Sequence, residues 1–130
     1  MIEIIVAIIS VVIFIFMVIF QFLIVLGLPL GHLAYGGQHD HEKLPKNLRI
    51  MSMVAIGIYI FASIIILERV GLIIFFNIPL VSIIATWILA IYFTLGVLMN
   101  MASKSNWEKR IMTPIALIIA VCCYIVAILA

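Results

Sequence analysis

The chain has 130 residues, of which 68% are hydrophobic and 9% are charged, and its mean hydropathy is +1.49. A soluble domain is closer to half apolar and one quarter charged, and a small fold leaves much of its surface in water. The composition therefore excludes a soluble globular protein and a disordered chain. Seven Lys and Arg against five Asp and Glu create no basic field, which excludes a nucleic-acid binder and leaves an integral membrane protein.

Four apolar stretches are each long enough to cross a bilayer as a helix. A membrane helix needs about 20 mostly apolar residues, because the hydrocarbon core is about 30 Å thick and a helix rises about 1.5 Å per residue. The predicted spans cover residues 4–26, 48–67, 79–101 and 111–130. The predicted fold is therefore all-α, a transmembrane four-helix bundle that forms a single domain over residues 1–130.

Basic residues are distributed unevenly between the connections. The connections 27–47 and 102–110, with the helix starts beside them, carry Lys43, Lys46, Arg49, Lys104, Lys109 and Arg110. The opposite side carries Arg69. Because cytoplasmic loops are enriched in Lys and Arg, we expect both basic connections in the cytoplasm, in contact with anionic lipids, and both termini outside.

The connection 27–47 contains strong turn signals. Gly27 and Pro29 predict the end of the first helix. The segment 30–35 is long enough for one or two helical turns and is followed by two glycines. We expect this segment to lie in the membrane interface, with Tyr35 at the level of the headgroups.

The start of the fourth helix is marked by a capping box. Ser105 and Glu108 have the spacing at which the serine accepts a hydrogen bond from the helix start and the glutamate reaches back to the serine. This pattern predicts that the helix begins near Asn106, before its apolar run.

Small residues recur on one face of the fourth span, at spacings of three and four. They are Thr113, Ala116, Ala120, Cys123, Ala127 and Ala130. In lipid, helices associate through small residues that let their backbones approach closely. This stripe predicts the packing seam of a left-handed helix crossing, with Ile118 and Ile119 facing lipid.

Polar residues gather at the cytoplasmic end of the predicted bundle: Gln21, His32, Tyr35, Arg49, Ser52 and Asn100. Polar groups in membrane spans tend to face a bundle interior or a cavity. One interpretation is a cytoplasm-facing ligand pocket that is closed by the segment 27–37. The other is that these groups hydrogen-bond one another and hold the helix ends. The outer half is almost wholly apolar, and Glu68 and Arg69 predict an interfacial ion pair there.

His39 and His41 form a candidate metal site. In an extended loop the two imidazoles point to the same side, and with Asp40 and Glu42 they would suit Zn²⁺ or Ni²⁺. A solvated polar loop without metal is the alternative interpretation. Nothing else in the sequence implies a cofactor.

Several turn and helix-start residues also carry a resemblance. They are Gly27-x-Pro29-x-Gly31, Gly36-Gly37, Leu44-Pro45, Arg49, Ser52 and Met112-Thr113-Pro114. This pattern covers most of the chain and resembles that of a group of uncharacterised short bacterial four-helix integral membrane proteins. The resemblance implies a four-helix fold and a bacterial plasma membrane, and it supplies no activity.

Two classes of function fit these features. One is a non-enzymatic membrane protein that acts by helix–helix association, as an accessory subunit or a small homo-oligomer. The other is a small-solute or ion transporter or channel with its pathway at an oligomer interface. The lack of a charge near the centre of any span argues against a proton-coupled pump, and the sequence contains no recognisable catalytic motif. The expected partners are the bilayer and a second copy or another membrane protein.

Overall fold

The computed structural model describes residues 1–37 and 44–130. Within these ranges it contains four α-helices: α1 (Ile2–Val25), α2 (Lys46–Arg69), α3 (Pro79–Met101) and α4 (Asn106–Leu129). Two short 3₁₀ turns, η1 (Gly31–Leu33) and η2 (Tyr35–Gly37), lie between α1 and α2. Each α-helix is long and apolar enough to cross a membrane, which confirms the predicted all-helical class with four such helices.

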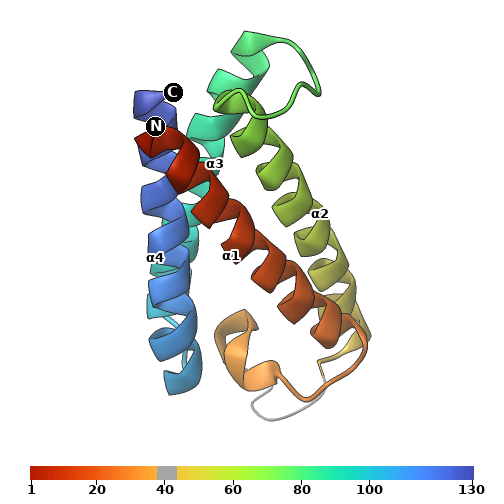
Figure 1. Cartoon of the computed structure of the whole chain (residues 1–130). Coiled ribbons are helices and arrows are strands. Elements are labelled where there is room, and N and C mark those ends of the chain that lie inside the picture. Colours follow the sequence, from red (N-terminus) through yellow and green to blue (C-terminus); the bar gives the residue numbers. More distant parts are fainter. Residues whose placement is uncertain (38–43) are drawn as a thin grey trace.

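The helices pack as two antiparallel hairpins, α1 with α2 and α3 with α4 (Figure 1). Helix α1 runs obliquely across the bundle, from the C-terminal end of α4 to the N-terminal end of α2. Both termini and the 70–78 connection lie at one end of the bundle. The described parts of the other two connections lie at the opposite end, where the η1–η2 segment lies between α1 and α4 (Figure 1).

The start of α4 follows its local sequence. The Ser105 hydroxyl accepts a hydrogen bond from the Glu108 amide at 3.3 Å, so the serine caps the helix. The predicted return contact of the Glu108 carboxylate is wrong, because the Ser105 amide donates instead to the Ser103 hydroxyl at 3.1 Å. Helix α4 begins at Asn106, as the capping signal predicts.

Three aromatic rings close the middle of the bundle. The Phe14 ring of α1 lies 5.9 Å from the Tyr59 ring of α2 and 5.5 Å from the Phe93 ring of α3, measured between centroids. Tyr59 and Phe93 stack at 6.1 Å. Phe14 and Phe93 are buried and Tyr59 is half-buried, so side chains fill the space between these three helices.

Helix α4 buries a broad face against α3 and α1. Of the predicted small-residue stripe, Ala116, Ala120, Cys123 and Ala127 are buried, and Thr113 and Ala130 at its two ends are partly buried. The prediction that Ile119 faces lipid with Ile118 is wrong for Ile119, which is 2% exposed, whereas Ile118 is 48% exposed. Ile119 lies three residues after Ala116 and four before Cys123, so a core-facing helix stripe includes it.

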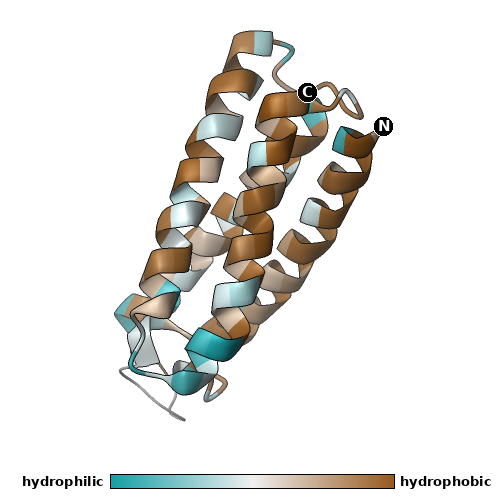
Figure 2. Ribbon diagram, turned by 90° about the vertical axis from the view of Figure 1, so that its left-hand side faces the viewer, coloured by the Kyte–Doolittle hydropathy of each residue, from teal (hydrophilic) through white to brown (hydrophobic). Residues whose placement is uncertain are grey.

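Large apolar side chains cover the outside of the helices. Each of the four helices exposes several large apolar side chains, drawn from Ile, Leu, Val, Met and the aromatic residues. Figure 2 shows this apolar colouring along the helices, with strongly hydrophilic residues concentrated at the end opposite the termini. An apolar surface of this extent suggests a lipid environment.

Candidate functional site

The η1–η2 segment is attached through its backbone to the connection between α3 and α4. Gly36 and Gly37 both have φ of +73°, a left-handed conformation that glycine adopts at little steric cost. The Gly36 carbonyl accepts a hydrogen bond from the Lys104 amide at 3.0 Å, and the Gly37 amide donates to the Ala34 carbonyl at 3.1 Å. The first bond joins the segment to the connection before α4, and the second closes a turn within the segment.

Ser105 is the contact point between the two connections. A Cβ atom added to Gly37 would lie 2.5 Å from the Ser105 Cβ and 2.8 Å from its amide nitrogen, so only glycine fits. The Ser105 hydroxyl, which caps α4, also donates to the backbone carbonyl of His32. The imidazole of His32 lies edge-on to the Trp107 indole, with 6.3 Å between ring centroids. Ser105 therefore links the helix cap to the docked segment.

Tyr35 and Ser52 are brought together by the same segment. Their hydroxyl oxygens are 2.9 Å apart, and either can donate. Burial raises the pKa of the Tyr35 hydroxyl above its usual value of 10.0, an effect that the bond to Ser52 partly offsets. The hydroxyl is therefore neutral at pH 7 and can act as donor or acceptor.

Arg49 caps the C-terminal end of α1. Its Nε and Nη2 atoms donate to the Val25 carbonyl oxygen at 3.1 Å and 2.7 Å. The last carbonyls of a helix lack partners within the helix and carry partial negative charge, so a guanidinium is well suited to this position. This bond joins the start of α2 to the end of α1.

Gln21 and Asn100 do not share a partner. The Asn100 side-chain amide donates to the Met112 carbonyl at 3.5 Å, which links α3 to α4. The Gln21 Oε1 atom is buried with no hydrogen-bond partner in the described chain, and the same is true of the Thr113 hydroxyl oxygen. Five of the six predicted site residues thus hold helix ends or the docked segment, and ligand binding by the six stays a prediction.

The candidate metal ligands His39 and His41 lie outside the described residues. Within residues 1–37 and 44–130, no group of three or more His, Cys, Asp or Glu side chains is placed to hold a metal ion.

A second polar site lies at the opposite end of the bundle, where α2 ends and α3 begins. The predicted ion pair between Glu68 and Arg69 is wrong, because these two described side chains bond elsewhere. Glu68 Oε1 accepts hydrogen bonds from the Phe75 amide at 3.0 Å and the Asn77 amide at 2.8 Å. Arg69 Nη2 donates to the Ala130 carbonyl. This end is thus more polar than its sequence suggests. The sequence does not reveal the site, because the groups that bind Glu68 are backbone amides of the connection that follows α2.

No family model, no curated protein and no solved structure matches this chain.

Proposed function

We propose that this protein is a small multi-pass membrane protein that acts without catalysis, through association of its helices with a second copy or with another membrane protein. The four long apolar helices support a place in a membrane. The buried small residues of α4 are already used inside the bundle, so a partner must meet a different surface.

The observation that carries this proposal is Gly57, on the outer face of α2. Gly57 is exposed, and an added Cβ would meet no atom within 4 Å. The residues three and four positions away, which share its helix face, are large and exposed: Met53, Val54, Ile60 and Phe61. A glycine among such residues leaves a notch in which a second helix can approach closely, and close approach drives association in lipid.

A small-solute or ion transporter is the second candidate. Because the rings of Phe14, Tyr59 and Phe93 fill the middle of the bundle, a pathway would have to run between protomers. The observation that favours transport is the buried, unpartnered oxygen of Gln21, since polar groups in spans often face a pathway. A cytoplasm-facing pocket around Gln21 would then open only in an oligomer.

We further propose that the two basic connections face the cytoplasm and that both termini lie outside, in a bacterial plasma membrane. Lys46, Lys104, Lys109 and Arg110 are exposed at the same end of the bundle, where they can contact anionic headgroups. Arg49 is half-buried and bonded to α1, so it contributes less to this contact.

The test is the oligomeric state in lipid, measured by single-molecule photobleaching of the labelled full chain at known protein-to-lipid ratios. Gly57→Leu fills the notch and should shift oligomers towards monomers or abolish capture of the partner. Val121→Leu enlarges an exposed residue of α4, outside the Gly57 face, and serves as the control that should retain association. Association that survives Gly57→Leu, or that is lost equally in the control, would contradict the proposal.

The same preparations distinguish the transport alternative. Proteoliposomes loaded with ions or small fluorescent solutes should retain their contents if association is the function. Leakage that requires the oligomer and changes with Gln21→Leu would instead establish the second candidate.

A further inference from the structure

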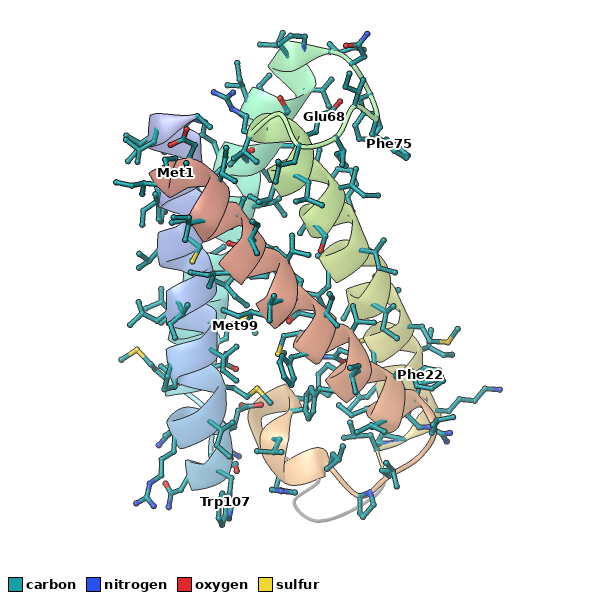
Figure 3. The ribbon with its side chains drawn as sticks, viewed as in Figure 1. Met1, Phe22, Glu68, Phe75, Met99 and Trp107 are labelled. Atoms are coloured by element: carbon teal, nitrogen blue, oxygen red, sulfur yellow. The ribbon has the colours of Figure 1, made fainter. Side chains whose placement is uncertain are left out.

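A small polar pocket lies between the last turn of α2 and the first turn of α3. Its volume is about 210 Å³, and Glu68 and Arg69 line it together with the apolar side chains of Ile73, Ile74 and Ile78. Figure 3 shows Glu68 at the end of α2, beside the connection that carries Phe75. The pocket is therefore at the end of the membrane spans, at the depth where headgroups meet acyl chains.

Each charged side chain in this pocket has one buried polar atom without a hydrogen-bond partner in the described chain. These atoms are Glu68 Oε2 and Arg69 Nε. The other oxygen of Glu68 is held by the amides of Phe75 and Asn77, and Arg69 Nη2 is held by the Ala130 carbonyl. The bonds that are made fix both side chains, so the unpartnered atoms have defined positions. Burying such atoms without partners is costly.

The two charges do not satisfy each other. No ion pair joins Glu68 and Arg69, both of which the structure describes. Adjacent residues on a helix do not face each other, so the two groups meet the pocket from different directions. A ligand that satisfies both must donate a hydrogen bond to the carboxylate and accept one from the guanidinium.

We propose that this pocket binds a zwitterion in which a primary ammonium lies a few atoms from an anionic oxygen group. The ammonium would donate to Glu68 Oε2, and a phosphate or carboxylate oxygen would accept from Arg69 Nε. The pocket is smaller than the roughly 300 Å³ at which sites for drug-sized ligands begin, so it suits a headgroup-sized molecule. The same chemistry has two sources, the ethanolamine phospholipid of the bilayer or a free zwitterion such as phosphoethanolamine.

The first arm of the test uses the full chain reconstituted with equal amounts of phosphatidylethanolamine and phosphatidylcholine. Lipid that remains bound is counted by native mass spectrometry. The choline headgroup has the same charge but no N–H donor, so the ethanolamine lipid should be retained about tenfold better. Because this comparison uses the unmodified chain, it does not depend on the folding of a variant.

A variant then assigns the preference to the pocket. Glu68→Gln retains an acceptor oxygen for the two amides but replaces the second oxygen with a donor, and it should abolish the preference. Glu3→Gln changes an acid at the same end of the bundle and outside the pocket, and it should retain the preference. A preference that survives Glu68→Gln would overturn the assignment.

The second arm distinguishes the two sources. Phosphoethanolamine or phosphocholine is added to the protein in detergent that contains no ethanolamine lipid, and the thermal midpoint of unfolding is measured. Stabilisation by phosphoethanolamine alone without lipid preference would identify a free zwitterion as the ligand, and lipid preference without this stabilisation would identify the phospholipid. Equal retention of both lipids together with no response to either free compound would overturn the proposal.

Discussion

The hydroxyl of Tyr35 lies 2.9 Å from the hydroxyl of Ser52, and this hydrogen bond fastens the η1–η2 segment to α2. The same segment is held on its other side by Lys104 and Ser105, which precede α4. One short piece of chain therefore bonds to both helical hairpins. We expect its contacts to stabilise the whole bundle and not just the connection in which they lie.

Tyr35→Phe should lower the free energy of unfolding by about 1–3 kcal/mol, because it leaves the fully buried Ser52 hydroxyl without this partner. Ser52→Ala should cost less, since Tyr35 is half-buried and water can reach part of it. Reversible unfolding in mixed micelles measures both values. If the bond matters, the double variant costs less than the sum of the single variants, and strict additivity would show that the two hydroxyls are uncoupled.

Gly36 and Gly37 provide a matched pair for testing the contact with Ser105. Both have φ of +73°, and an alanine in this left-handed conformation lowers the free energy of unfolding by about 1–2 kcal/mol at either position. An added Cβ meets nothing within 4 Å at Gly36 but lies 2.5 Å from the Ser105 Cβ at Gly37. Gly37→Ala should therefore destabilise clearly more than Gly36→Ala in the same unfolding assay. Equal losses would mean that the segment can move away from Ser105 at little cost.

The helices could be predicted from the sequence because apolar length alone identifies a membrane span. The exact ends of the helices do not always follow from apolar length. Helix α2 runs from Lys46 to Arg69, beyond the apolar stretch 48–67, because backbone hydrogen bonding continues through charged residues at both ends. The start of α4 was predictable because Ser105 signals a helix cap independently of hydropathy.

The sequence predicts which residues gather at the candidate site, but it does not predict their hydrogen-bond partners. Depth along the spans places Arg49 and Asn100 near one end, but nothing in the spacing indicates that their partners are the Val25 and Met112 carbonyls. The contact of Gly37 with Ser105 joins residues far apart in sequence and depends on how the two hairpins meet.

Glu68 and Arg69 illustrate a different limit. Opposite charges in adjacent positions suggest a pair, but neighbouring residues on a helix point in different directions. Glu68 instead binds backbone amides of the following connection, where Asn77 has a left-handed φ of +56°.

Ala120→Leu tests the packing of α4. Ala120 is 4% exposed, so three extra heavy atoms overpack the helix interface and should cost about 1–3 kcal/mol of unfolding free energy. Ile118→Ala is the control at a position that is 48% exposed, and it should cost less. Ile119→Ala, which empties a buried position, should cost about 2–5 kcal/mol and be the more damaging of the two isoleucine changes. Similar thermal shifts for all three variants would mean that the buried face is not the stabilising interface.

The orientation in the membrane is tested by single cysteines at exposed positions of the two ends. Lys104 lies in the connection between α3 and α4, and Ile74 lies in the connection between α2 and α3, where it is 80% exposed. In intact bacterial cells, Lys104→Cys should react with a membrane-permeant maleimide but not with an impermeant one, because the basic connections are expected in the cytoplasm. Ile74→Cys should also react with an impermeant maleimide from outside. The native Cys122 and Cys123 are buried inside α4, and the parent chain measures their background. Labelling of Lys104→Cys by the impermeant reagent, with protection of Ile74→Cys, would reverse the proposed orientation and place the Glu68 pocket on the cytoplasmic side.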